Sequence, residues 1–151
     1  MSRLIQATCV ALNGRGVLIQ GAPGTGKSSL ALALIDRGAV LVGDDGVRIE
    51  AQGGLLRAFP PPHIAGLLEV RNVGLVPQPV TSFVPLALVL ELTTEAHRLP
   101  DEPETLMLEG IALPLVRLWP DSPVLALRAE AALDRRGLSF AANDPQIGIG
   151  Q

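Results

Sequence analysis

The first part of the chain alternates short apolar runs with turn residues, a pattern typical of strands. Residues 4–12 and 17–20 form two such runs, and residues 13–16, Asn-Gly-Arg-Gly, predict a tight turn between them. Residues 28–36 are a longer apolar run without a helix breaker and are followed by Gly38, a typical C-terminal cap, so they predict a helix. Because this helix is apolar almost all round, we expect it to pack against a sheet.

The middle of the chain predicts further strands. The apolar or alternating runs are residues 39–43, 47–51, 55–59 and 84–92. Gly53-Gly54 predicts a turn, and the three prolines at 60–62 interrupt regular structure. Residues 64–70 lead into a loop or a short strand around Arg71.

The last third of the chain predicts a loop, strand structure and a second helix. Residues 93–105, with two prolines and four acidic residues, predict an exposed, mobile loop, and residues 106–119 predict strand structure. Asp121-Ser122-Pro123 is a typical helix start, and the helix is expected to end at Gly137. The pattern as a whole predicts one α/β domain over residues 1–140, with a strand-rich mixed sheet, two or three helices and a frayed tail over 141–151.

Composition narrows the class of protein. A chain of 151 residues with 48% hydrophobic and 18% charged residues is expected to fold as a single globular domain. A net charge of −3 argues against nucleic acid or an anionic membrane as the main partner. No apolar segment is long enough to span a bilayer, no signal peptide is apparent, and a single cysteine cannot form an internal disulfide. These features predict a cytoplasmic protein.

One motif has a specific chemistry. Residues 21–28, Gly-Ala-Pro-Gly-Thr-Gly-Lys-Ser, match the phosphate-binding loop pattern G-x-x-x-x-G-K-[ST], with a predicted strand before it and a predicted helix after it. Glycines allow backbone N–H groups to turn toward a polyphosphate, and the helix N-terminus adds positive potential. Lys27, the only lysine of the chain, would bridge the β- and γ-phosphates of ATP, and the Ser28 hydroxyl would ligate Mg²⁺. The alternative, a glycine-rich turn with an incidental lysine, does not explain the complete spacing.

Paired carboxylates follow the next predicted strand. Asp44 and Asp45 are separated from Lys27 only by a short helix and a strand, which is where a magnesium ligand of a phosphate loop is expected. One carboxylate can hold the metal while the other accepts the proton of the attacking hydroxyl. The structural alternative is an ordinary Asp-Asp-Gly turn between two strands. The neighbouring phosphate loop favours the functional interpretation.

These residues resemble a known family. The run from Gly21 to Ile49, GAPGTGKSSLALALIDRGAVLVGDDGVRI, is similar to the catalytic core of HPr kinase/phosphorylase, which phosphorylates a serine of the phosphocarrier protein HPr. Residues 66–76, GLLEVRNVGLV, resemble the second signature of that family. The resemblance extends from about Gln6 to Arg136. It implies a fold like the nucleotide domain of phosphoenolpyruvate carboxykinase, with ATP and Mg²⁺ as cofactors and an HPr-type phosphocarrier as partner. The resemblance also implies phosphate-dependent dephosphorylation at the same site and a hexameric assembly.

The resemblance implies roles for individual residues. Asp44 resembles the base that deprotonates the acceptor serine, Asp45 and Glu69 resemble carboxylates on the metal side, and Arg71 would face the transferred phosphoryl group. Arg98, in the sequence His97-Arg98-Leu99, resembles an arginine that acts at a subunit interface. The residues expected to bind the nucleotide are Gly21, Ala22, Pro23, Gly24, Thr25, Gly26, Lys27, Ser28 and Ser29. For Glu69 and Arg71 the structural alternative is an ion pair across strands, and for His97 it is a solvated loop residue.

The chain also departs from the family pattern. Gln6 stands where the family usually has a histidine, and glutamine cannot shuttle a proton. Asn72 stands where the signature has glycine, and asparagine tolerates a positive φ. The segment before the last helix, residues 115–122, has Arg117 as its single cation and is shorter and less basic than the corresponding loop of the family.

Two other functions remain open at this point. A small-molecule kinase with a P-loop has a similar length, but it needs a lid bearing arginines and a long helical half, and residues 93–105 contain a single arginine. A nucleotide-binding regulatory module without phosphoryl transfer is the other possibility, with Gln6 as the sign of lost chemistry. Tight ATP binding without turnover would distinguish that module from a kinase.

Overall fold

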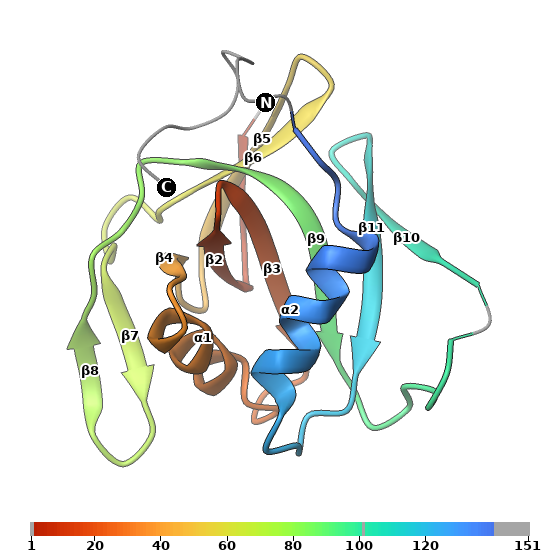
Figure 1. The fold of residues 1–151 in the computed structure, drawn as a ribbon. Coiled ribbons are helices and arrows are strands. Elements are labelled where there is room, and N and C mark those ends of the chain that lie inside the picture. Colours follow the sequence, from red (N-terminus) through yellow and green to blue (C-terminus); the bar gives the residue numbers. More distant parts are fainter. Residues whose placement is uncertain (1, 101, 141–151) are drawn as a thin grey trace.

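The structure, a computed structural model, describes residues 2–100 and 102–140, and Figure 1 shows its fold. The described residues form eleven strands and two helices. The elements are β1 (Ser2–Ile5), β2 (Thr8–Leu12), β3 (Arg15–Gly21), α1 (Lys27–Asp36), β4 (Val40–Gly43), β5 (Val47–Gln52), β6 (Leu55–Phe59), β7 (Leu67–Val70), β8 (Gly74–Pro77), β9 (Val84–Leu92), β10 (Glu104–Leu108), β11 (Ile111–Leu118) and α2 (Leu125–Arg136). The mixed α/β fold predicted from the sequence is therefore confirmed.

Nine strands form one strongly curled sheet. Its order is β1-β5-β6-β9-β3-β2-β4. In addition, β11 pairs with the C-terminal half of β9, and β10 pairs with β11. The pairs β3–β9 and β9–β11 are parallel, and the other pairs are antiparallel. Strand β9 pairs with β6 through Val84 and Pro85, and with β11 through residues 89–92. The start of β9 therefore belongs to the part of the sheet with β1, β5 and β6, and the rest of β9 belongs to the part with β3 and β11. The sheet folds over on itself at this strand.

Two apolar cores lie on opposite sides of the central strands. One core packs α1 and α2 against β2, β3 and β9, and it includes Leu30, Leu34, Leu88 and Leu133. The other core fills the space inside the curled sheet, between β5 and β6 on one side and β2, β3, β9 and β11 on the other. Figure 1 shows both helices on the same side of β2 and β3. The expectation that the first helix packs against a sheet is confirmed.

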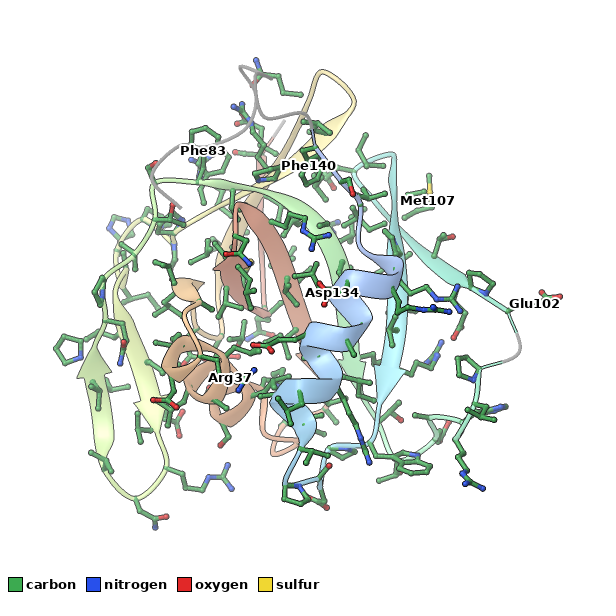
Figure 2. All side chains as sticks on the ribbon, in the orientation of Figure 1. Arg37, Phe83, Glu102, Met107, Asp134 and Phe140 are labelled. Carbon is green, nitrogen blue, oxygen red and sulfur yellow. The ribbon has the colours of Figure 1, made fainter. Side chains whose placement is uncertain are left out.

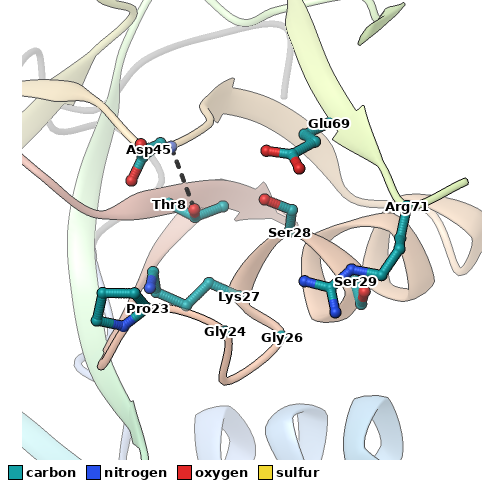
Figure 3. Close-up of a pocket in the computed structure, with 10 residues that line it drawn as sticks. All are labelled: Thr8, Pro23, Gly24, Gly26, Lys27, Ser28, Ser29, Asp45, Glu69 and Arg71. Atoms are coloured by element: carbon teal, nitrogen blue, oxygen red, sulfur yellow. Dashed lines mark hydrogen bonds between the residues drawn. The ribbon is translucent and has the colours of Figure 1, made fainter. Parts of the chain in front are cut away.

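The hairpin β7–β8 forms a separate two-stranded sheet that projects beside α1 (Figure 1). Leu68 is fully buried and Val70 is partly buried in the core around α1, so one face of the hairpin is anchored there. The other face presents Glu69 toward the N-terminal end of α1, as Figure 3 shows. The fold thus brings a distant segment of the chain beside the phosphate-loop sequence.

Several predicted boundaries are wrong for identifiable reasons. Residues 4–12 are two strands, because residues 2–5 pair with β5 while residues 8–12 pair with β3 and β4. The strand structure predicted over residues 106–119 is present, but it is divided into the two strands of a hairpin, whose turn at Glu109 and Gly110 has φ values of 48° and 79°. Strand β10 already begins at Glu104, inside the predicted loop, and β8 after Arg71 was not predicted.

The second helix also begins later than predicted. The hydroxyl of Ser122 accepts a hydrogen bond from the N–H of Val124, which forms a turn ahead of the first helical residue, Leu125. The predicted end at Gly137 agrees with the structure, where α2 ends at Arg136. The predicted frayed tail over 141–151 lies outside the described residues. Neither helix in the described part of the chain has the length and apolar character that would let it cross a membrane.

Candidate functional site

A polar pocket of about 240 Å³ lies at the N-terminal end of α1 (Figure 3). It is built where four segments meet: the start of β2, the loop between β3 and α1, the turn between β4 and β5, and β7 with its turn. The lining residues are Thr8, Pro23, Gly24, Gly26, Lys27, Ser28, Ser29, Asp45, Glu69 and Arg71. All of them except Thr8 belong to the candidate set from the sequence.

The phosphate-loop sequence adopts the predicted strand-loop-helix context. Gly26 has a φ of 94°, a left-handed conformation that glycine adopts without strain, and α1 begins at the next residue, Lys27. The Lys27 ammonium donates hydrogen bonds to the carbonyl oxygens of Gly21 at 3.0 Å and Ala22 at 3.3 Å. The ammonium group of the only lysine of the chain is therefore fixed against the first two residues of its own loop. There its charge and the N-terminal end of α1 favour an anion.

Asp44 is bonded from three directions. Its Oδ1 accepts hydrogen bonds from the hydroxyl of Ser28 at 2.6 Å and from that of Thr8 at 3.0 Å. Its Oδ2 accepts a hydrogen bond from the backbone N–H of Glu69 at 2.8 Å. A single half-buried carboxylate thus ties β2, the first turn of α1 and β7 together. The structure places this predicted residue directly against the P-loop serine.

Asp45 occupies a different position, although it is the next residue. It is exposed, lines the pocket and has a left-handed φ of 59°. Its backbone N–H donates to the Thr8 hydroxyl at 3.3 Å, the dashed line of Figure 3. The preceding turn is very tight, because a Cβ on Gly43 would collide with the carbonyl oxygen of Gly46. This backbone directs neighbouring carboxylates to different surroundings.

Glu69 and Arg71 reach the pocket from β7 and its turn. Figure 3 shows the Glu69 carboxylate pointing toward Ser28 and the Arg71 guanidinium lying beside Ser29. Neither side chain forms an ion pair with another described residue. Asn72 has a φ of 71°, which confirms that asparagine takes the left-handed conformation in this turn. The hairpin therefore adds one carboxylate and one cation to the phosphate-loop end of the pocket.

Other candidate residues lie outside the pocket lining. The backbone of Gly21, Ala22 and Thr25 completes the loop, and Arg98 is exposed in the segment between β9 and β10. Gln6, the predicted substitute for histidine, is also exposed and is not among the lining residues. Sequence reasoning missed Thr8. The available signal was a hydroxyl residue at the start of an otherwise apolar strand, two positions after Gln6.

The oxygen atoms around Ser28 fit a magnesium ion that arrives with a nucleotide. Asp44 contacts Ser28 directly, and Asp45 and Glu69 line the same pocket. In residues 2–100 and 102–140 no group of three His, Cys, Asp or Glu side chains is placed to hold a metal ion by itself. Magnesium is usually held by one or two carboxylates together with water and substrate phosphates, so a complete protein cage is not required.

Comparisons with known proteins place this arrangement in a family context. Residues 1–118 match the family described as HPr Serine kinase C-terminal domain. The HPr kinase/phosphorylase of Brevibacillus brevis is 52% identical over 64 residues, which cover 42% of this chain and 21% of that protein. That of Streptococcus thermophilus is 35% identical over 127 residues, which cover 76% of this chain and 41% of that protein. The chain thus spans between about a fifth and two fifths of the length of these relatives.

A solved structure has the same fold. The HPr(Ser) kinase/phosphatase from Coxiella burnetii superposes with a TM-score of 0.76 at 28% sequence identity. The match covers 87% of this chain and 88% of that chain. The curled sheet with two helices is therefore shared almost in full with a protein of that name.

Proposed function

This chain belongs to the family of HPr serine kinase C-terminal domains, and we propose that it is an ATP-dependent protein-serine kinase acting on an HPr-type phosphocarrier. The observation that supports the proposal is the pocket, where Lys27 and Ser28 of a phosphate loop face carboxylates and Arg71. In the reaction, the serine oxygen of the acceptor bonds to the γ-phosphorus while the bond to the ADP oxygen breaks. The serine proton passes to a carboxylate.

The loop and the hairpin have separate tasks in this proposal. Lys27 and the backbone N–H groups of residues 21–26 bind the β- and γ-phosphates, and Arg71 faces the phosphoryl group as it moves. Ser28 and the nearby carboxylates would hold Mg²⁺, which neutralises phosphate charge when it is bound. Arg98 lies outside the pocket lining, so a role for it requires a second subunit, as in the hexamer that the family resemblance implies.

The contacts favour exchanging the roles predicted for the two aspartates. Asp44 accepts three hydrogen bonds, one of them from the P-loop serine, which suits a carboxylate on the metal side. Asp45 is exposed in the pocket, where an acceptor hydroxyl could approach it. We therefore propose Asp45 as the proton acceptor, with Asp44 and Glu69 on the side of Ser28.

A transfer assay tests the proposed function. The protein is incubated with Mg²⁺, ATP labelled in the γ-phosphate and purified HPr-type phosphocarriers, while nucleotide affinity is measured by calorimetry. Label on a phosphocarrier is the expected result. Nucleotide binding without label on any phosphocarrier would reject the kinase and support a regulatory module. The composition of the pocket lining favours this second candidate, because the lining contains no histidine and Gln6 lies outside it.

A further inference from the structure

Thr8 has no place in the phosphate-loop motif, yet it is central to the hydrogen bonds of the pocket. It is the first residue of β2, is fully buried and lines the pocket. It is one of two buried polar residues in the described part of the chain. Its neighbours along β2, Cys9 and Val10, are apolar core residues. A buried hydroxyl among apolar core residues is costly unless it forms hydrogen bonds, so its hydrogen-bond partners indicate its role.

The Thr8 hydroxyl makes one hydrogen bond to each aspartate. It donates to Asp44 Oδ1 at 3.0 Å and accepts from the backbone N–H of Asp45 at 3.3 Å. A hydroxyl has one proton and two lone pairs, so this proton is fully used on Asp44. The two bonds fix the side chain of one aspartate and the backbone of the other. The Asp45 backbone is left-handed, a conformation that is uncommon for residues with a side chain although aspartate adopts it more readily than most, and the bond from its N–H to Thr8 helps to hold it there.

The position of the Asp44 carboxylate in turn determines that of the P-loop serine. Asp44 Oδ1 accepts from both Thr8 and Ser28, so the Thr8 hydroxyl helps to fix where the Ser28 proton points. With its proton directed at Asp44, Ser28 keeps its lone pairs for a metal ion. Thr8 thus acts on the metal side of the pocket through Asp44, and on the side of the proposed proton acceptor through Asp45.

We propose that Thr8 is a positioning residue that orients Asp44 for the metal side of the pocket and holds Asp45 in its left-handed, pocket-facing conformation. The inference rests on the proposed function only for its effect on phosphoryl transfer. Its effect on nucleotide binding in the presence of Mg²⁺ does not require transfer. A residue that only fills space in β2 would affect neither property.

The test compares Thr8→Val, which keeps the branched shape and removes the hydroxyl, with Thr8→Ser, which keeps the hydroxyl. For each variant, calorimetry measures ATP affinity with and without Mg²⁺, and the transfer assay gives kcat and KM. Loss of residues that orient metal ligands typically lowers metal affinity or activity about 10- to 100-fold. We expect Thr8→Val to lower kcat by a factor of this size. We also expect it to reduce, by a similar factor, the increase in ATP affinity that Mg²⁺ causes. Affinity for ATP without Mg²⁺ should stay the same, and Thr8→Ser should recover most of the loss.

The matched control is Cys9→Ala, the next residue of β2, which is equally buried but lies in the core inside the curled sheet. It should lower the melting temperature without changing the Mg²⁺ dependence of ATP binding. If Thr8→Val keeps the full gain from Mg²⁺, or if Thr8→Ser is as impaired as Thr8→Val, the positioning role is wrong. If wild type labels no phosphocarrier while Thr8→Val still loses the gain from Mg²⁺, the proposed kinase function fails and the metal-side role of Thr8 remains.

Discussion

Two carboxylates of this molecule each accept several short hydrogen bonds, but their surroundings differ. Glu130 on α2 accepts two hydrogen bonds of 2.8 Å from the guanidinium of Arg37, next to the end of α1. Asp44 accepts bonds from two hydroxyls and one backbone N–H, at 2.6 to 3.0 Å. Arg37, labelled in Figure 2, lies where α1 faces α2, whereas Asp44 lies beside the pocket at the opposite end of α1.

The difference lies in the charge of the donors. Arg37 neutralises Glu130, and its hydrogen bonds lower the pKa of the Glu130 carboxyl while raising the pKa of the guanidinium. The donors to Asp44 are all neutral, so its negative charge is positioned without being cancelled by them. The first carboxylate links α2 to the end of α1. A carboxylate of the second kind retains charge for a cation from outside the chain, such as one that accompanies a nucleotide.

The largest expected effect comes from removing the cation of the pocket. Lys27→Ala should reduce phosphoryl transfer below detection, because no other lysine exists to bind the β- and γ-phosphates. The circular dichroism spectrum should not change, since Lys27 bonds only carbonyl oxygens of its own loop. The matched control, Arg37→Ala, removes an exposed cation near the other end of α1 and should leave transfer intact. Equal activity in both variants would reject the phosphate-loop assignment.

The two aspartates provide the next comparison. Asp45→Asn should lower kcat about 100-fold or more with little change in ATP affinity, because it removes the proposed proton acceptor. Asp44→Asn should weaken ATP binding in the presence of Mg²⁺ and transfer together. The two parameters are separated by transfer kinetics and calorimetry. If Asp44→Asn instead lowers transfer far more than binding, Asp44 is the base, as the family resemblance implies.

A smaller effect is expected from Gln6→His. Histidine can exchange a proton near neutral pH and glutamine cannot, so phosphate-dependent dephosphorylation of the phosphocarrier should appear or rise. The measurement is release of label from a phosphorylated phosphocarrier with increasing inorganic phosphate. An unchanged rate would show that position 6, which lies outside the pocket lining, does not limit the reverse reaction.

The smallest effect is expected at the ion pair between the helices. Glu130→Gln should lower the melting temperature by about 2–4 °C at most, since exposed ion pairs contribute little. The folded protein lowers the pKa of Glu130, so the stabilisation is present above the pKa of the unfolded chain and is lost as pH falls through the folded pKa. Melting curves of wild type and variant should converge at acidic pH. A change in transfer rate would contradict the purely structural role of the pair.

The sequence predicts elements well where the local pattern and the tertiary environment agree. Residues 84–92 were predicted with their observed bounds, because β9 is buried along almost its whole length and is therefore apolar throughout. Residues 4–12 are also largely apolar, yet they divide between two parts of the sheet. Nothing in the hydrophobic pattern marks the crossing at Gln6 and Ala7, because pairing partners are decided by the fold.

The site shows the same limit. The phosphate loop is predictable because its chemistry depends on eight consecutive residues, and the pocket contains five of them. Thr8 is not predictable in this way, since its partners are 36 and 37 residues away. The surroundings of Asp44 and Asp45 also depend on tertiary contacts, with α1, β2 and β7. Which of two adjacent carboxylates faces a pocket is therefore a property of the fold.

The proposed function is phosphoryl transfer from ATP to a serine of a phosphocarrier in the pocket at the N-terminal end of α1. The most direct measurement is tandem mass spectrometry of an HPr-type phosphocarrier after incubation with ATP and Mg²⁺, with wild type and Lys27→Ala compared. We expect phosphate on one serine with wild type and none with Lys27→Ala. An unmodified phosphocarrier with wild type, or the same phosphoserine with both proteins, would contradict it.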